Sequence, residues 1–228
     1  MAIASIRELL LAHACERLGR EGMGALQARG IARSVGVSTT ALYTHFGSMA
    51  GLTAAVCEEC FRRLTEAVEA VEVTDDALVD LLSTGLAYRN HAIRHPYEYE
   101  LMFDKALHRL PRGVRLDYDA PPPGVPAVGV GSFGIMVTRA TRLLEQGRIA
   151  PNDPAVVSAQ LWAALHGFVT LELAGHFGPA PDLPVFAGLF ANLFVGMGAE
   201  RADVLAALGK SAMRVPMIAT GDRIPFSA

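Results

Sequence analysis

The sequence predicts an all-α fold with about nine helices. Apolar residues recur three and four positions apart along most of the 228-residue chain, which is the spacing that one face of a helix requires. Serine, threonine and aspartate, which suit helix N-termini, and glycine, which suits C-termini, stand between these apolar runs. A convincing alternation of apolar and polar residues, the pattern of a half-buried strand, is found nowhere. Together these three observations favour helices throughout.

The first three expected helices are closely spaced, and the second and third are short. Ser5-Ile6-Arg7-Glu8 is a capping-box pattern, so a helix begins after Ser5. The second helix is expected at about Leu26–Val35, where Gly36 breaks it. Ser38 is placed to cap a third short helix. Residues 1–47 are therefore expected to form a first domain.

A long fourth helix, residues 48–72, connects this domain to a second one, residues 73–228. Proline and glycine crowd residues 109–131, which predicts one long loop. Thr74 or Asp75 is expected to cap a fifth helix, which His95-Pro96 ends, and a sixth helix carries Tyr97 to Leu107. A seventh helix is expected at about Ser132–Gln146, with Ser132 as its cap. The eighth and ninth are expected at about Pro154–Phe177 and Leu183–Gly198. The tail from Ala199 is expected to form one short helix and then irregular chain.

Composition limits the class of protein. The chain is 51% hydrophobic and 19% charged, which is too apolar for disorder and leaves apolar surface for a partner or a ligand. A net charge of −3 argues against a protein that coats nucleic acid without regard to sequence, but a local basic face can still bind DNA. Three cysteines, an odd number, do not make a disulfide framework, so we expect a reducing cytoplasm. A signal peptide is not expected, because Glu8 and Glu16 interrupt the first apolar stretch.

The most membrane-like segment is Ala155–Phe177. It contains Glu172 and two histidines, His166 and His176, and a carboxylate in the middle of a bilayer is costly. We therefore expect a buried core helix there and no membrane partner.

The most informative segment runs from Glu21 to Leu52. Two short helices joined by a glycine-containing turn bury too little apolar surface to be stable alone, so the helices on either side must brace them. In a helix-turn-helix, the second short helix lies in the major groove of DNA with its N-terminal residues facing the base edges. The residues expected to touch bases or phosphates are Gln27, Arg29, Arg33, Ser38, Thr39, Thr40, Tyr43, His45 and Ser48.

This segment resembles the TetR family. Its IA-xxx-GVS-xxx-LY-x-HF pattern is matched by the run Gly30-Ile31-Ala32-Arg33-Ser34-Val35-Gly36-Val37-Ser38-Thr39-Thr40-Ala41-Leu42-Tyr43-Thr44-His45-Phe46. The resemblance implies a homodimer, operator DNA, an all-helical C-terminal domain and release from DNA on ligand binding.

Two positions depart from the pattern. Gln27 stands where Thr or Ser often caps the second helix, and Met49 stands where Lys usually supplies a phosphate contact. Lower affinity or a different phosphate clamp is expected, rather than loss of DNA binding.

A second, shorter resemblance lies in the eighth expected helix. Trp162, His166 and Gly167 are similar to the W-x3-H-G pattern of one group of TetR-family C-terminal domains. Trp162 and His166 are i, i+4 neighbours on one helical face. His166 either exchanges a hydrogen bond with a ligand or is a core histidine satisfied within the protein. Aromatic and methionine side chains suit an adaptable pocket, and those expected to bind the effector are Tyr99, Met102, Phe103, Phe133, Met136, Trp162 and His166.

The eighth and ninth expected helices are the candidates for a dimer interface. The ninth is too apolar to face water alone, since it carries Phe186, Leu189, Phe190, Leu193, Phe194 and Met197. Pairing of both helices across a two-fold axis gives a four-helix bundle. We therefore expect a homodimer through these two helices.

Three other patterns suggest different chemistry. Cys57-Glu58-Glu59-Cys60 is a C-x-x-C pattern, but it lies inside a helix, which favours packing over zinc binding or redox sensing. His91 and His95 are i, i+4 neighbours that either bind a transition metal or place favourable cations near a helix C-terminus. The G-x-G-x-x-G match at 129–134 follows a proline-rich loop with no βαβ unit, so a flexible loop end is expected there in place of a dinucleotide site. No metal ion and no cofactor is predicted.

These features predict a ligand-responsive transcriptional repressor that binds a palindromic operator as a homodimer and is released by a small apolar or aromatic molecule. The expected partners are double-stranded operator DNA and that small-molecule effector. The alternative is a ligand-binding or interaction protein of the same fold with weak or lost DNA binding, which Gln27 and Met49 favour slightly. An enzyme is not expected, because the sequence has no nucleophile elbow, phosphate loop or metalloprotease spacing.

Overall fold

A computed structural model of the chain describes residues 5–104, 127–178 and 180–219. These residues form ten α-helices, one short 3-10 helix and no strand, so the all-α prediction is confirmed with one helix more than expected. In chain order they are α1 (Ile6–Glu21), η1 (Met23–Ala25), α2 (Ala28–Val35), α3 (Thr39–Phe46), α4 (Met49–Glu69), α5 (Ala77–Arg94), α6 (Pro96–Met102), α7 (Ala127–Glu145), α8 (Pro154–Leu173), α9 (Leu183–Gly196) and α10 (Arg201–Arg214).

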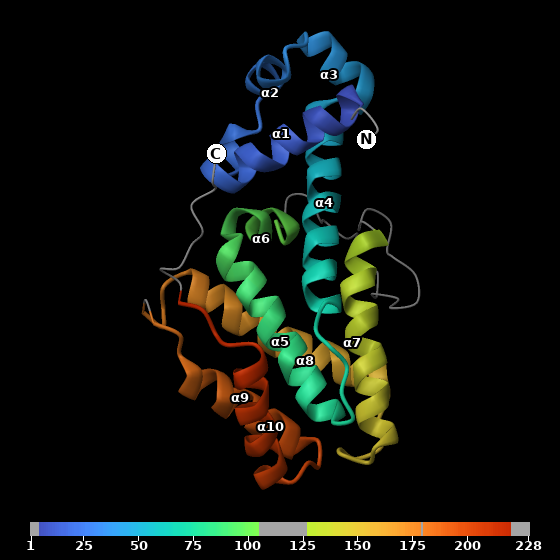
Figure 1. Cartoon of the computed structure of the whole chain (residues 1–228), viewed down its shortest axis with the longest axis vertical. Helices are drawn as coiled ribbons and strands as arrows, with labels where there is room; N and C mark the ends of the chain where they lie inside the picture. Colours follow the sequence, from blue (N-terminus) through green and yellow to red (C-terminus); the bar gives the residue numbers. More distant parts are fainter. Residues whose placement is uncertain (1–4, 105–126, 179, 220–228) are drawn as a thin grey trace, which may run out of the picture.

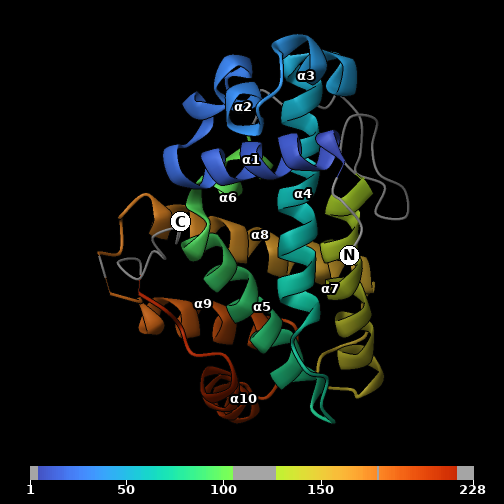
Figure 2. The same ribbon diagram turned by 45° about the horizontal axis from the view of Figure 1, so that its top comes forward.

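The helices form two groups that α4 joins (Figures 1 and 2). At one end of the molecule, α1, α2 and α3 lie around the N-terminal part of α4. The rest of α4 extends away from them and packs against α5 and α7, while α8, α9 and α10 complete the second group. The short helix α6 lies where the two groups meet and contacts both α1 and α4. One buried apolar cluster runs through both groups.

Local signals determine the three short helices as expected. The Ser5 side chain accepts a hydrogen bond from Glu8 N, and the Glu8 carboxylate accepts one from Ser5 N, which completes the capping box. Gly36 ends α2 in the left-handed conformation at φ +77°. Ser38 caps α3 by accepting a hydrogen bond from Ala41 N at 3.2 Å. The residues that hold these helices to α1 and α4 are fully buried and apolar: Leu10, Leu18, Ile31, Leu42 and Leu52.

The start of α5 differs from the prediction. Asp76 is its N-cap and accepts hydrogen bonds from two backbone N–H groups of the first turn, so the expectation of Thr74 or Asp75 was wrong. The Thr74 hydroxyl is occupied elsewhere, because it donates to the Asp80 carboxylate at 2.7 Å. Asp80 is in turn held by Arg142 of α7. The choice of cap therefore depends on a tertiary contact that the local sequence does not specify.

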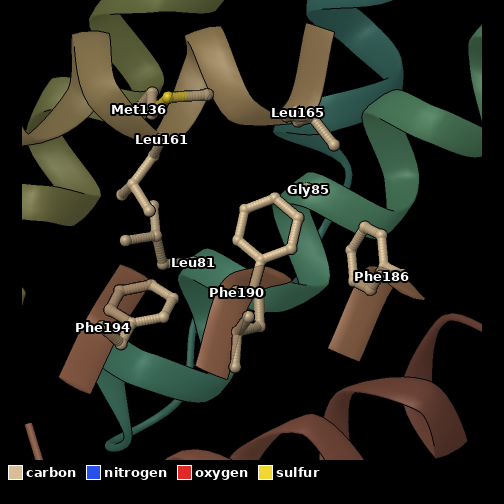
Figure 3. A pocket seen from close by; sticks show the side chains of 9 residues that line it. Leu81, Gly85, Met136, Leu161, Leu165, Phe186, Phe190 and Phe194 are labelled. Atoms are coloured by element: carbon tan, nitrogen blue, oxygen red, sulfur yellow. The ribbon is translucent and has the colours of Figure 1, made fainter. Parts of the chain in front are cut away.

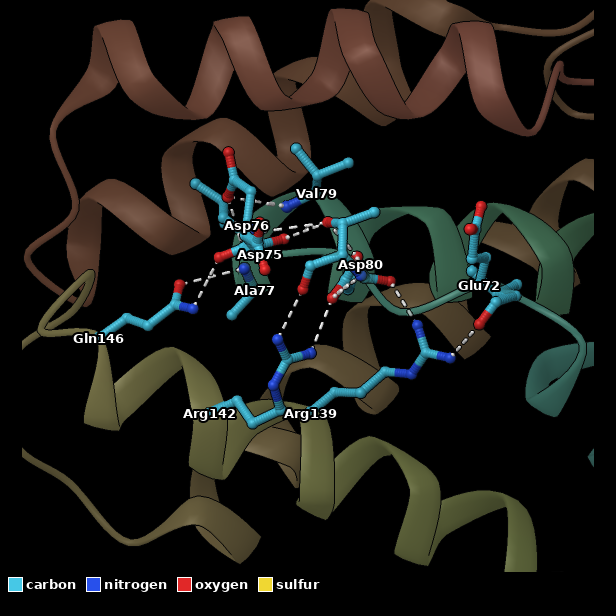
Figure 4. Close-up of polar contacts among 12 residues, drawn as sticks. Glu72, Asp75, Asp76, Ala77, Val79, Asp80, Arg139, Arg142 and Gln146 are labelled. Carbon is cyan, nitrogen blue, oxygen red and sulfur yellow. Dashed lines mark hydrogen bonds and ion pairs between the residues drawn. The ribbon is translucent and has the colours of Figure 1, made fainter.

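A cluster of polar contacts fixes the loop between α4 and α5 onto α7 (Figure 4). This polar clamp consists of Thr74, Asp80, Arg139, Arg142 and Gln146. Arg142 donates to the Asp80 carboxylate and to Thr74 O, both at 2.7 Å. Arg139 donates to the carbonyl oxygens of Asp80 at 3.0 Å and Val71 at 2.7 Å. Because charged and backbone groups satisfy one another here, the C-terminal end of α4 is firmly held.

The long loop expected at 109–131 is shorter at its C-terminal end. Helix α7 begins at Ala127, so Ser132 lies inside the helix and is not its cap. The glycine pattern at 129–134 is also helical, and the expectation of a flexible loop end there was wrong. A Cβ built on Gly131 lies 3.5 Å from Thr65 of α4, so packing against α4 stabilises a helical turn that glycine alone disfavours. The rest of the expected loop, and Leu107, lie outside the described residues.

The tail is more extensive than the one short helix expected. Helix α10 has 14 residues and is tied to α5, because the Ser211 hydroxyl donates to Val79 O at 3.0 Å. Residues 215–219 then return along α5, where Arg89 donates to Ile218 O at 3.0 Å. Arg89 also pairs with Glu172 of α8, and both side chains are fully buried. These partners lie 83 to 132 positions apart in sequence, so no local pattern reveals them.

Helix α8 is the only described helix that is long and apolar enough, by length and composition, to cross a membrane. The core helix of a globular protein passes the same test. Helix α8 contributes Leu161, Leu165 and Val169 to the core and Glu172 to the buried ion pair with Arg89. These contacts are those of the core helix that the sequence predicts.

Candidate functional site

The nine residues expected to contact DNA lie at one end of the molecule, on α2, on α3 and at the caps that open α2, α3 and α4 (Figure 2). We call them the recognition surface. Thr39 is half-buried, and the other eight are exposed: Gln27, Arg29, Arg33, Ser38, Thr40, Tyr43, His45 and Ser48. Leu42 is the buried residue of α3 and determines which face of the helix packs inward. The outward face is polar and lies beside the free backbone N–H groups of two helix N-termini, which attract phosphate.

Arg7 adds a cation beside this surface that sequence reasoning did not single out. Its guanidinium carbon lies 5.1 Å from the centre of the Phe46 ring, at the end of α3. Arg7 is exposed, so this cation–π contact holds the charge near α3 without burying it. Nothing in the sequence indicates the contact, because it depends on how α1 packs against α3.

The two departures from the family pattern have visible consequences. Gln27 occupies the N-cap of α2 but makes no capping hydrogen bond, and its Nε2 donates instead to Gly24 O at 3.1 Å. Met49 opens α4 and packs, half-buried, against the apolar core. Ser48 keeps the capping role at α4 by accepting a hydrogen bond from Gly51 N at 3.0 Å. The backbone start of α4 is therefore intact, although the side chain after Ser48 carries no charge.

Five of the seven residues expected to bind the effector gather in one aromatic cage, which consists of Tyr99, Phe103, Phe133, Trp162 and His166. The His166 ring lies in the middle, with ring-centre distances of 4.5 Å to Phe103 and 5.6 Å to both Tyr99 and Trp162. Phe103, Phe133, Trp162 and His166 are only half-buried, whereas Tyr99 is buried. Burial lowers the pKa of His166, so its imidazole is neutral at neutral pH.

A chain of buried hydroxyl groups leads from α5 into this cage. Tyr88 Oη lies 3.1 Å from Tyr99 Oη, which lies 2.7 Å from His166 Nδ1. Burial raises the pKa of Tyr88 to about 12 and also raises that of Tyr99, so both hydroxyls keep their protons. Tyr88 was not expected at the site, because the contact joins helices that the sequence alone does not bring together.

The other two expected effector residues lie elsewhere. Met102 is a core residue with 1% of its surface exposed. Met136 lines a small apolar cavity between α5, α7, α8 and α9 (Figure 3). The other side chains that line it, with Gly85, are Leu81, Leu82, Leu161, Leu165, Phe186, Phe190 and Phe194. This cavity offers no polar side chain, in contrast to the cage with its histidine.

Two family profiles match the chain. Residues 10–56 match the profile of bacterial regulatory proteins of the tetR family, and residues 81–210 match a tetracyclin repressor-like C-terminal domain. An uncharacterized HTH-type transcriptional regulator of Mycobacterium tuberculosis (strain ATCC 25618 / H37Rv) is 30% identical over 195 residues, which cover 84% of this chain and 81% of the relative. The chain belongs to the TetR family.

Solved structures agree with this TetR-family fold. A protein with unknown function from Rhodococcus sp. RHA1 gives a TM-score of 0.70 at 29% identity and covers 86% of this chain and 96% of its own. RolR in complex with resorcinol gives a TM-score of 0.64 at 15% identity over 92% of this chain and 94% of its own, which shows the fold alone. The TetR assignment makes the chain a transcriptional regulator with a helix-turn-helix DNA-binding domain and a ligand-binding C-terminal domain.

In this TetR-family regulator, three consecutive residues of α6 touch three different parts of the molecule. The Tyr97 ring lies at the C-terminus of α1, where a Cβ on Gly22 is 3.3 Å from it. The buried Glu98 carboxylate accepts a hydrogen bond from Arg63 of α4 at 2.8 Å. Tyr99 reaches His166 in the cage. The short helix therefore contacts the cage, α4 and the DNA-binding domain at once.

The three cysteines and His91 are buried, and His95 beside His91 is half-buried. Burial raises the pKa of both the Cys15 and the Cys57 thiol to about 12. The rings of His91 and His95 lie 4.8 Å apart, and burial lowers the pKa of His91 to about 3. Within the described ranges, no three or more His, Cys, Asp or Glu side chains are grouped to hold a metal ion.

Proposed function

We propose that the protein is a ligand-responsive repressor that binds a palindromic operator as a homodimer and leaves it when a small apolar or aromatic effector binds. Residues 1–47 are then the DNA-binding domain, residues 48–72 the connection, and residues 73–228 the effector-binding and dimerisation domain. One observation carries the proposal: α4 contacts α1 and α3 of the DNA-binding domain and α7 of the cage, and α6, which contacts α1 and α4, carries the cage residue Tyr99. The cytoplasm, where operator DNA lies, is the proposed location, and an odd number of cysteines, three, is compatible with it.

Support for the DNA interface comes from the polarity of the recognition surface. Thr40 and Tyr43 are exposed on α3, where small and polar-tipped side chains can reach base edges and phosphates. Arg29 and Arg33 are exposed on α2 and supply positive charge for phosphate contacts. Sequence reading is proposed for α3, and positioning on the phosphate backbone for α2 and the serine caps.

Support for a homodimer comes from apolar side chains that remain exposed on two helices. Val156 and Leu171 on α8, and Val185 and Val195 on α9, are 37–46% exposed. Two recognition helices must also lie about 34–36 Å apart to enter successive major grooves, which one copy of α3 cannot satisfy. Leu171→Glu is expected to convert the dimer to a monomer in light-scattering measurements, whereas Met213→Glu, on the exposed face of α10, is expected to leave it dimeric.

The aromatic cage is the proposed effector site. Its rings come from α6, the residue after it, α7 and α8, so a planar molecule among them touches elements that are distant in sequence. RolR, which shares this fold, has been seen with resorcinol, a small aromatic compound. We propose an effector of that general size for this protein.

Release from DNA is proposed to pass through α6. A ligand that enters the cage beside Tyr99 and His166 moves the helix that also carries Tyr97 against α1 and Glu98 against Arg63 of α4. The ligand can act only through its different affinities for the two arrangements. A hundredfold loss of operator affinity requires about 2.7 kcal/mol of coupling.

The proposal is tested by selecting operator DNA from a random duplex pool with the full chain and titrating the recovered sequence in a gel shift. A two-fold symmetric site is expected. Tyr43→Ala is expected to weaken binding by about tenfold, the value of one good base or phosphate contact. Leu205→Ala, a similarly exposed side chain on α10, serves as the control and is expected to change nothing. Failure to recover any specific sequence contradicts the repressor proposal.

A second candidate function follows from Gln27 and Met49: a ligand-binding protein of the same fold with weak or lost DNA binding. The uncapped start of α2 and the missing positive charge at the start of α4 both favour it. Met49→Lys separates the two functions. It is expected to tighten a specific complex and to steepen its salt dependence by about one unit, whereas a protein without a DNA function gains only non-specific binding.

A further inference from the structure

The hydrogen-bond chain into the cage has a direction that the side chains themselves determine. It runs from Tyr88 through Tyr99 to His166. The Tyr88 hydroxyl has one hydrogen to donate, and a buried donor needs an acceptor. The acceptor that Tyr88 finds therefore sets the direction of the chain.

Tyr88 is 4% exposed, and in the described part of the chain its hydroxyl partner is Tyr99. Tyr88 therefore donates to Tyr99, whose own hydrogen is left for His166 Nδ1 at 2.7 Å. In the reverse direction the Tyr88 oxygen would accept from Tyr99 and its own hydrogen would have no acceptor among the described residues, and a buried donor without an acceptor costs free energy. The forward direction satisfies every group in the chain.

The consequence lies at the other side of the imidazole ring. A neutral histidine carries one N–H group, so a ring whose Nδ1 accepts from Tyr99 has its hydrogen on Nε2. The hydrogen bond that His166 makes within the described residues is the one at Nδ1, which leaves Nε2 available. His166 therefore brings an N–H donor into the cage, on a ring whose centre lies 4.5 Å from that of Phe103 and 5.6 Å from that of Trp162.

We infer that the effector is an uncharged aromatic compound with an acceptor oxygen, such as an aryl ketone or ester, which takes a hydrogen bond from His166 Nε2. The inference rests on the proposed function, because it deepens the assignment of the cage as the effector site. Apolar rings on the other sides of the ligand favour a planar aromatic body. A neutral acceptor is favoured over a carboxylate, since burying an unpaired charge among rings is costly.

The tautomer is tested directly by long-range ¹H–¹⁵N NMR of the histidine side chains in the full chain. The His166 signals, identified by their loss in His166→Phe, are expected to report a protonated Nε2 and an unprotonated Nδ1 at pH 7.5. Tyr99→Phe, which removes the hydroxyl donor to Nδ1, is expected to give a mixture of tautomers. A wild-type ring that carries its hydrogen on Nδ1 overturns the inference without touching the proposed site.

Ligand class is tested with two phenyl compounds of similar size, acetophenone and cumene, the second of which has no acceptor oxygen. Titration calorimetry compares wild type with His166→Phe, which keeps an apolar ring but removes the donor. Acetophenone is expected to bind the variant about tenfold more weakly than wild type, and cumene no more weakly. Equal losses for both probes overturn the inference, and the cage survives as a site. If neither probe binds wild type, the effector site of the proposed function fails with it. Tyr99→Phe supplies the same comparison if His166→Phe does not fold, because mixed tautomers reduce the preference for acetophenone.

Discussion

The buried polar groups at the two ends of α5 differ in how completely they are satisfied. At the N-terminal end, Asp80 accepts hydrogen bonds from Arg142 and from both the N–H and the hydroxyl group of Thr74. Within the described residues, four buried side-chain atoms have no hydrogen-bond partner: three lie at the C-terminal end, His91 Nε2, His95 Nδ1 and Glu98 Oε2, and the fourth, Ser83 Oγ, lies within α5. Unsatisfied buried groups raise the free energy of the conformation that holds them.

This difference separates a fixed end from a movable one. The satisfied end anchors the C-terminus of α4 to α7, whereas the unsatisfied end adjoins α6, which contacts α1, α4 and the cage. In a regulator that changes between two arrangements of similar free energy, we expect unsatisfied polar groups beside the elements that move. We expect fully hydrogen-bonded groups where the elements stay in place. Substitutions at the two ends are therefore expected to have different signatures.

The largest loss of stability is expected at the buried pair between Arg89 on α5 and Glu172 on α8, which lies between the two ends. Glu172→Ala leaves the Arg89 charge buried without its carboxylate, which is expected to lower the free energy of unfolding by about 3–5 kcal/mol in urea denaturation. Glu66→Ala, which breaks the exposed pair with Arg62, is the matched control and is expected to cost less than about 1 kcal/mol. Similar losses for both variants would contradict the distinction between buried and surface pairs.

The movable end is expected to make stability depend on pH. Burial, the neighbouring His95 and two arginines lower the pKa of folded His91 to about 3, so the unfolded chain takes up a proton first as the pH falls below about 6.5. Stability present above pH 6.5 is therefore lost between pH 6.5 and 3, at up to about 1.4 kcal/mol per pH unit. His91→Asn is expected to reduce the loss between pH 7.5 and 4.5 by about 3 kcal/mol.

The control for this pH experiment is His176→Gln, at an exposed position after α8. It is expected to leave the pH dependence of unfolding as in wild type. An unchanged dependence in His91→Asn would place the acid sensitivity elsewhere and remove the contrast between the ends of α5.

At the fixed end, Asp80→Asn is expected to lower the free energy of unfolding by about 1.5–3 kcal/mol, the value of hydrogen bonds to a charged group. The amide cannot pair with Arg142 as a carboxylate does. Asp182→Asn at the N-cap of α9 changes the same atoms where Asn is also a good cap, so its expected cost is under about 0.5 kcal/mol. Operator affinity measured per folded protein is expected to stay at the wild-type value in both variants, and a large change in Asp80→Asn would show that the clamp takes part in the transition.

The smallest stability effect is expected in the cage. Tyr99→Phe removes the hydroxyl between Tyr88 and His166 and is expected to cost about 0.5–1.5 kcal/mol in thermal or urea unfolding. The same variant is expected to change effector-dependent release from DNA more than it changes stability. A variant that unfolds more easily but responds to effector as wild type would make this hydrogen-bond chain purely structural.

The sequence by itself determined the all-α fold and the recognition segment. Capping signals at Ser5, Gly36 and Ser38 and apolar spacing act over a few residues, so they can be interpreted without knowing what packs where. Only the tertiary structure decided the cap of α5, the early start of α7 and the partners of Tyr88, Arg89 and Arg7. Each depends on contacts between elements far apart in the chain, and the free energy of such a contact appears only when the helices have packed together.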